Sequence, residues 1–587
     1  MASRAEAPSE SAEGSVTHGA VFRPALWACE ACGRARHDSL RPWVGELGSE
    51  PPIRLTKGIH MKKLAGKPRE PARRKRSATG TGVSFRDVDM TALRLLAEEL
   101  PPDDDLADII ADLLSTDLDD PDAIPDAEML SELNGALNQA RLDAAGGDIE
   151  ARKTLKNIRA MIDEAAGRDA IHPAMLMMFG RLLAGAQIEI GEPARTALGR
   201  ALDLGALKGS AADAYEALLR PALSQSGSDP FELHEEVEAL ISIFPVAYRS
   251  AFVERMAVDS DALIRRSAVG FLLDRDEAPA EAAIRGLGAA PRGLDDERRR
   301  WIETIRPWLA PPQRSALDAG LPGARRAAPR PAAKIVKTIA SVCDGSGVSF
   351  LLATVKVGSR CLLASVMIKP TGINDCMSYE NLSSNEATVL ERALRSSAPS
   401  SEISFAAWEK LLRLALGHNL SCGEPPPFAL VGLVEALGLD SLAPDFATPS
   451  EIIASALADV ADRDRAETIR AAHEFAAKTE LTDNWFEAGE EVEAVMSAAR
   501  SASAGARALI ESYLPSRREF WAAQCARSAL ALKDGARPRD QTWKHLALVG
   551  RDLADEMPLS RIPLIHRIAE ISARAYSLQK AQRSAAA

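Results

Sequence analysis

The sequence has no uninterrupted apolar run of about 18 residues, the length that a helix needs to cross a bilayer. Its first thirty residues lack an apolar stretch behind basic residues, so we expect no secretion signal. Cysteines are few: seven, an odd number, are scattered over 587 residues, unlike the dense set of a secreted disulfide framework. These absences predict a cytoplasmic protein with reduced thiols and no membrane contact.

Aromatic residues are also scarce, at 5% of the chain, whereas alanine and leucine are abundant. This usage favours helices over β-sandwiches, and the excess of arginine over lysine suggests a GC-rich bacterial genome. The net charge of -12 argues against binding of nucleic acid by the whole surface. The length predicts about three or four domains or a continuous repeat array.

Signatures of common chemistries are missing from the sequence. It contains no G-x-x-x-x-G-K phosphate loop, no H-E-x-x-H zinc motif and no calcium loop of EF-hand spacing. Cys29, Cys32 and His37 form three quarters of a zinc knuckle, but Pro42 occupies the place of the fourth ligand. We interpret this segment as disordered or spurious sequence rather than a metal site, and we expect no cofactor.

The N-terminal region, residues 1–89, lacks helical periodicity, and we expect it to be disordered. Met61 resembles an alternative start. A basic segment at 62–76 carries eight basic residues and one acid, and it ends in Arg73, Arg74, Lys75 and Arg76. The favoured interpretation is a solvated tail that can fold back on residues 95–140, which hold fourteen acids and no base; nucleic-acid contact, if any, is expected only through this segment.

Apolar residues recur at helical spacing between residues 90 and 309, which predicts a helical array or bundle. One stretch, around residues 244–273, resembles a HEAT repeat. Asp261 and Arg265 carry the signature of its second helix, together with Ile264, Ala268 and Leu272. The resemblance implies that the acid caps that helix, that the arginine bridges to neighbouring repeats and that helix pairs stack.

Residues 310–333 are rich in proline and arginine, and we interpret them as a linker. The periodicity then changes. Residues 334–400 predict a small module with three antiparallel strands joined at two glycine-containing turns, and residues 401–580 predict a C-terminal helical domain. The expected fold class is therefore mainly α: a helical, HEAT-like array or bundle, a three-stranded β module and a C-terminal helical domain.

Two groups of residues are candidates for a site. Arg517, Arg518, Trp521 and Trp543 combine cations with aromatics, which is typical of binding hot spots, although packing in the core is the commoner reason for such aromatics. In the β module, the residues that would serve an enzyme are Asp344, Lys369, Asp375 and Cys376.

Because no catalytic motif is found, the favoured function is a non-enzymatic scaffold that binds a protein partner through a helical-repeat surface. The alternative is an enzyme or nucleic-acid-processing accessory with a site in the β module. Convergence of the four β-module residues in a cleft would favour that alternative.

Overall fold

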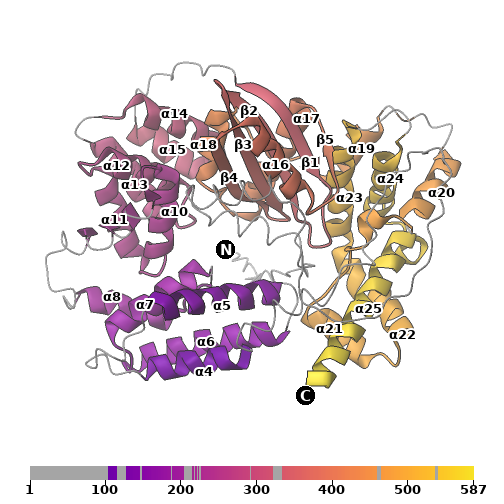
Figure 1. The fold of residues 1–587 in the computed structure, drawn as a ribbon, viewed down its shortest axis with the longest axis horizontal. Helices are drawn as coiled ribbons and strands as arrows, with labels where there is room; N and C mark the ends of the chain where they lie inside the picture. The colour runs from indigo at the N-terminus through magenta and orange to yellow at the C-terminus, as the bar shows by residue number, and fades with distance from the viewer. Residues whose placement is uncertain are drawn as a thin grey trace, which may run out of the picture. The chain divides into compact units, whose positions relative to one another are not determined.

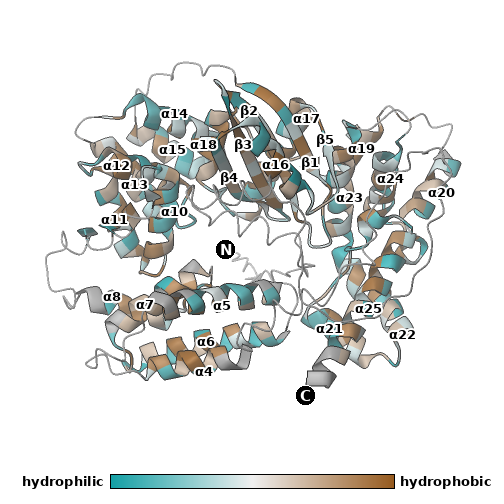
Figure 2. Ribbon diagram, viewed as in Figure 1, coloured by the Kyte–Doolittle hydropathy of each residue, from teal (hydrophilic) through white to brown (hydrophobic). Residues whose placement is uncertain are grey.

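The computed structural model is mainly α-helical, as the sequence predicts, and contains one antiparallel sheet (Figure 1). It describes residues 103–115, 127–145, 149–186, 188–203, 226–290, 293–321, 333–439, 441–458, 465–476, 478–535 and 540–586, with short pieces between 215 and 223 and at 460. No helix among these residues is both long and apolar enough to span a membrane. Figure 2 shows hydrophobic stretches along the central strands and alternation of hydrophobic and hydrophilic residues on the helices.

The first described helices each bury one apolar face. They are Asp103–Leu114 (α4), Ala127–Ala145 (α5), Ile149–Gly167 (α6), Pro173–Gly185 (α7) and Glu192–Asp203 (α8). In α4, Leu106, Ile110 and Leu113 lie three or four residues apart, so they share a face, and all three are buried. α6 packs against α4, α5 and α8.

A second set of helices lies between residues 230 and 320. It comprises Pro230–Ile241 (α10), Val246–Ala257 (α11), Ala262–Ser267 (α12), Ala268–Leu273 (η3), Glu277–Ala289 (α13), Asp296–Ile305 (α14), Arg306–Trp308 (η4) and Pro311–Gly320 (α15). Aspartates cap α10, α12 and α14: Asp229, Asp261 and Asp295 each accept a backbone N–H of the following turn. α11 packs against α13, and α13 packs against α15.

The sheet has five strands. They are Lys334–Ser341 (β1), Ser349–Val357 (β2), Arg360–Lys369 (β3), Gly372–Leu382 (β4) and Ser400–Glu402 (β5), in the order β4-β3-β2-β1-β5 with every neighbouring pair antiparallel. Every residue of β3 from Cys361 to Ile368 is buried, and side chains alternate between faces, so both faces are covered there. Helices Ser384–Arg395 (α16), Phe405–Cys422 (α17) and Ala429–Ala436 (α18) pack against the sheet.

The prediction of three strands is wrong in number. The predicted strands are present as β1, β2 and β3, but β4 and β5 extend the sheet on its two sides. β4 is an edge strand with many exposed polar residues, and β5 has three residues, so neither shows a clear apolar alternation. The turn of a further hairpin lies at residues 370–372, between β3 and β4, with Gly372 at φ +120°.

The predicted linker at 310–333 also differs from the structure in its first half. Residues 311–320 form α15, and Leu317 of that helix is buried in the core. Pro311 and Pro312 open the helix at positions where the missing proline N–H removes no intrahelical bond. Residues 322–332 of the segment lie outside the described residues.

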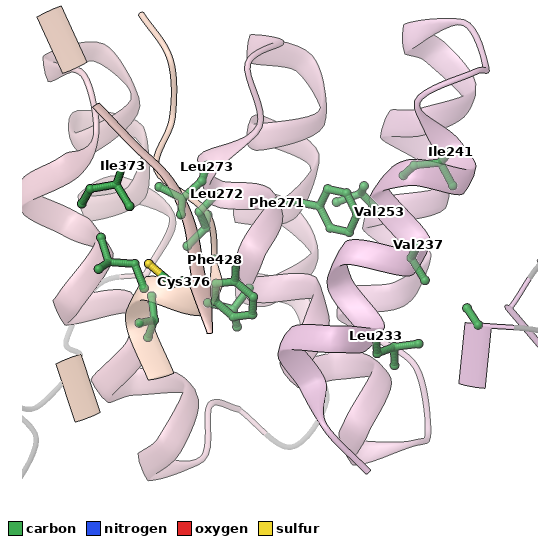
Figure 3. Close-up of a cluster of buried hydrophobic side chains, with 14 of the residues drawn as sticks. Leu233, Val237, Ile241, Val253, Phe271, Leu272, Leu273, Ile373, Cys376 and Phe428 are labelled. Atoms are coloured by element: carbon green, nitrogen blue, oxygen red, sulfur yellow. The ribbon is translucent and has the colours of Figure 1, made fainter. Parts of the chain in front are cut away.

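An aromatic cluster joins the second helical set to the sheet. Phe428, next to α18, lies 4.8 Å from Phe231 and 5.0 Å from His234 of α10, measured between ring centroids. Trp301 of α14 lies 5.6 Å from the same ring, and its Nε1 donates to Glu435 of α18 at 2.8 Å. Figure 3 shows side chains of α10, α11, η3 and β4 gathered with Phe428 in one buried cluster. The two regions therefore share a core.

The C-terminal helices have their own core, centred on Trp485 and Trp521. The elements are Pro449–Leu457 (α19), Arg465–Ala476 (α20), Glu480–Thr482 (η6), Glu490–Ala498 (α21), Ala502–Ala508 (α22), Leu509–Tyr513 (η7), Leu514–Arg517 (η8), Arg518–Lys533 (α23), Thr542–Ala554 (α24), Leu559–Arg561 (η9) and Pro563–Ala586 (α25). α23 packs against α24 and α19, and α25 packs against α20, α21 and α22.

Candidate functional site

Two residues of the predicted hot spot meet a buried carboxylate that the sequence analysis missed. Glu487 is 3% exposed, and its Oε1 accepts from Arg517 Nε at 2.8 Å and from Trp521 Nε1 at 2.9 Å. Tyr513 donates its hydroxyl to Oε2 at 3.1 Å. Burial raises the pKa of the Glu487 carboxyl, and Arg517 and the other donors oppose that rise. Trp521 is fully buried, so it belongs to the core and presents no surface to a partner.

One of these donors, Tyr513, lies in a π-helical turn. The turn η7 ends at Tyr513, and Arg517 follows at the end of η8. The wider π turn rotates Tyr513 relative to a regular α-helix, and such turns often occur where a side chain must be aimed at a specific group. The guanidinium of Arg517 also lies 3.9 Å from the centroid of the Phe520 ring. Arg517 therefore contacts both the carboxylate of Glu487 and the ring of Phe520.

The other two hot-spot candidates lie apart from this carboxylate. Arg518 donates to the carbonyls of Leu553 and Met557, each at 3.0 Å, and so ties α23 to the end of α24. Trp543 is half-buried on α24, and the ammonium of Lys533 lies 5.2 Å from its ring centroid. The structure therefore brings Arg517 and Trp521 together but not the four residues as a surface patch.

A groove on the surface of the C-terminal helices is the candidate site. Its volume is about 770 Å³, within the range of ligand pockets. Residues of α25 form one wall, residues of η9 form a second wall, and Asp483 lies at the edge. The lining residues are Asp483, Ser560, Arg561, Pro563, His566, Arg567, Glu570, Ile571 and Arg574. We call this surface the α25 groove.

The stripe on α25 follows from helical spacing. Arg567, Glu570, Ile571 and Arg574 are separated by three, one and three residues, so their side chains share one face. The seven-residue spacing of Arg567 and Arg574 is the sequence signal for this stripe. The third arginine, Arg561, lies on η9, and only the fold brings it beside the stripe.

The charges in the groove are unevenly paired. Arg567 forms an ion pair with Asp483, and its side chain is 16% exposed. Arg561 and Arg574 are exposed, and neither forms an ion pair with a residue that the structure describes. The exposed His566 donates from Nε2 to the carbonyl of Ser560 at 2.8 Å. The N-terminal end of α25, which opens at Pro563, adds partial positive charge at the same place. The groove therefore favours an anionic ligand.

The Glu487 network fixes one edge of the groove. The backbone N–H of Glu487 donates to Ser572 Oγ at 2.8 Å, which anchors the chain segment after η6 to α25. Asp483 lies four residues earlier on this segment. The buried Glu487 carboxylate accepts hydrogen bonds from three side chains and so holds this loop in place. The loop carries Asp483, which forms the ion pair with Arg567.

The β-module candidates lie in the turn between β1 and β2 and in the hairpin formed by β3 and β4. Asp344 lies in the turn between β1 and β2, where its Oδ1 accepts from Ser346 and Val348, and burial raises its pKa. The carbonyl of Lys369 accepts from Arg527 at 3.4 Å near the same end of the sheet. Asp375 and Cys376 lie further along β4, where burial, Asp375 and Glu235 raise the pKa of the Cys376 thiol. Asp375 lies opposite Met367, two residues before Lys369, so Lys369, Asp375 and Cys376 belong to the same hairpin.

The HEAT-like signature is placed as follows. Asp261 caps α12 by accepting from Leu263 N at 2.7 Å. Arg265 donates to the carbonyls of Asp259 and Ser260, at 2.6 Å and 2.7 Å, in the loop that precedes its own helix. The expected bridge from Arg265 to a neighbouring repeat is therefore not what this side chain makes.

Several candidates lie outside the described residues. These are the zinc-knuckle residues Cys29, Cys32 and His37, the basic residues Arg73, Arg74, Lys75 and Arg76, and the whole of the region 1–89. Among the residues that the structure does describe, no group of three or more His, Cys, Asp or Glu side chains has the arrangement of a metal site.

Two parts of the chain match protein families. Residues 245–328 match the Y4lR second domain, and residues 450–577 match the Y4lR C-terminal helical domain. The chain is 26% identical over 502 residues to the uncharacterised protein y4lR of Sinorhizobium fredii, an alignment that covers 79% of this chain and 92% of that protein. No solved structure matches. The C-terminal match spans every residue that lines the α25 groove.

Proposed function

We propose that this chain is a non-enzymatic interaction protein that binds a protein partner at the α25 groove. The observation that carries the proposal is the pair of exposed arginines, Arg561 and Arg574, in a groove of about 770 Å³ without an ion-pairing partner among the described residues. An arginine exposed beside a groove is a common anchor for carboxylates at protein interfaces, because its planar guanidinium donates two parallel hydrogen bonds.

A HEAT-like helical array is part of the same proposal. It is supported by the packing of α11 against α13 and of α13 against α15, and by the cap that Asp261 supplies to α12. Such arrays present extended surfaces to protein partners. We also propose that the protein acts in the cytoplasm, which fractionation of the cells that make it would test.

The experiment compares three full-length proteins in affinity purification from the native cell. The groove variant is R561E/R574E, and the matched control is R500E/R507E, which makes the same charge change at exposed positions outside the groove. A partner is expected to be retained by the wild type and the control and lost from the groove variant. Isothermal calorimetry with the purified partner is then expected to give the same ranking.

Identical sets of bound proteins from all three chains would contradict the proposal. So would turnover of a substrate by the purified protein at a site that the groove variant leaves intact. Circular dichroism of each variant establishes that the charge reversals leave the helical content unchanged, which the exposure of both arginines leads us to expect.

A further inference from the structure

We infer that the occupant of the α25 groove is an extended, acidic peptide segment of the partner, with two carboxylates spaced to meet Arg561 and Arg574. This inference rests on the proposed function and adds the chemistry that the groove selects.

The pairing of charges in the groove determines the charge that a ligand must carry. Arg567 is neutralised by Asp483 and is mostly covered, so it acts as part of the wall. Arg561 and Arg574 remain exposed at separate positions along the groove. A ligand with one charge would satisfy a single arginine, whereas two carboxylates on one chain satisfy both.

The length of the wall sets the length of the segment. The α25 residues that line the groove extend from Pro563 to Arg574, and these two positions are eleven steps, or about 16 Å, apart at 1.5 Å per residue. An extended peptide advances about 3.3 Å per residue, so about five residues follow this wall. The two carboxylates are therefore expected within about five residues of each other.

The acids in the groove favour a peptide over a nucleic acid. Glu570 lies on the stripe between the arginines, and Asp483 lies at its edge. A phosphate backbone carries a charge at every nucleotide and would place some phosphates against these carboxylates. A peptide can place a neutral or basic residue opposite Glu570. The half-buried Pro563 and Ile571 offer apolar contact to a side chain between the two acids.

The test is selection from a random library of linear dodecapeptides on the full-length protein. The wild type and R500E/R507E are expected to enrich sequences with two acidic residues within about five positions. R561E/R574E is expected to lose this enrichment. A synthetic peptide from the most enriched sequence should bind the wild type and the control with similar Kd, and the groove variant at least tenfold more weakly.

Three results would overturn the inference: no enrichment of acidic pairs, equal binding by the groove variant, or tighter binding of a single-stranded oligodeoxynucleotide than of the selected peptide. If the selected peptides are not acidic while the native partner still depends on Arg561 and Arg574, the inference fails and the proposed function stands. If the native partner ignores the groove, the proposed function fails with it.

Discussion

A single buried carboxylate organises the C-terminal core. Glu487 is almost fully buried, and each of its oxygens accepts at least one hydrogen bond from Arg517, Trp521 or Tyr513. Removing one member of a buried ion pair leaves the other charge without compensation, which costs more than removing both. The free energy of unfolding should therefore respond differently to single and double substitutions here.

We expect R517M to lower the free energy of unfolding by about 3–5 kcal/mol, because it leaves Glu487 charged and buried. The double variant E487Q/R517M should recover a large part of this loss, since no buried charge remains, the glutamine Oε1 can accept from Trp521 and its Nε2 can donate to the hydroxyl of Tyr513. Urea unfolding followed by circular dichroism measures the free energy of unfolding of the wild type and of each variant. R507M, at an exposed arginine, should change stability by less than about 0.5 kcal/mol. Equal losses in the single and double variants would contradict the uncompensated-charge account.

His234 makes stability depend on pH. Its Nδ1 lies 3.1 Å from the carbonyl of Ser267, which only accepts, so the neutral ring carries its proton on Nδ1. Burial lowers the pKa of His234 to about 4 from an ordinary 6.5, against the weaker opposite effects of this hydrogen bond and of Asp274. The unfolded chain therefore takes up a proton below pH 6.5 that the folded protein refuses until about pH 4.

The contribution of His234 to stability should consequently fall as the pH drops from 6.5 toward 4, by about 2 kcal/mol between pH 7 and pH 5. H234N keeps a donor near the position of Nδ1 and removes the titrating ring, so it should be less stable overall but lose less between the two pH values. Urea midpoints at pH 7 and pH 5 measure this difference. The exposed His566 gives the control, because H566N should retain the wild-type pH dependence. Parallel pH profiles for H234N and the wild type would contradict the assignment.

At the level of helices, Gly417 shows how an element can be misread. Glycine often follows the end of a helix, so the sequence pattern alone would end this helix near Gly417. The structure continues α17 to Cys422 and ends it at Gly423, whose φ is +69°. Gly417 lies inside the helix because Asp445 approaches it: a Cβ there would lie 2.0 Å from the Asp445 carbonyl oxygen.

G417A is therefore expected to destabilise the protein by about 1–3 kcal/mol, because either α17 or the backbone at Asp445 must move. The control is G135A on α5, where a Cβ meets nothing within 4 Å and the residue is exposed. Alanine has the better helix propensity, so G135A should stabilise by about 0.5–1 kcal/mol. Thermal unfolding compares the two. A gain in stability for G417A would show that the close approach is relaxed in solution.

Burial and local packing also determine which elements could be predicted from the sequence and which could not. Helices with long apolar periodicity and the strands β1, β2 and β3 could be predicted from the sequence. Burial of one helix face, or alternation of apolar and polar residues along a strand, produces a recognisable local sequence pattern. β4 and α15 were missed, since an edge strand with polar residues and a helix opened by two prolines resemble loops. Glu487 and Arg561 acquire their neighbours only through packing of segments distant in the chain, which no local pattern encodes.

Across the chain, the helices that precede the sheet and the sheet itself have a continuous core. The apolar cluster includes Leu233 of α10, Phe271 of η3, Ile373 of β4 and Phe428. Hydrogen bonds reinforce the junction, among them Trp308 Nε1 to the carbonyl of Leu442 at 2.7 Å. Because these regions share buried side chains, we expect them to unfold together rather than as independent domains.

Phe428 is the residue through which this coupling can be tested, since its ring contacts those of Phe231, His234 and Trp301. F428A should lower the free energy of unfolding by about 3–5 kcal/mol and reduce amide hydrogen-exchange protection in both η3 and β4. Phe446 is 60% exposed, so F446A makes the same chemical change at the surface and should leave protection in both elements unchanged. A loss of protection in β4 alone would contradict this prediction. It would mean that the helices before the sheet are stable independently of the sheet, so that the shared core does not couple the two regions.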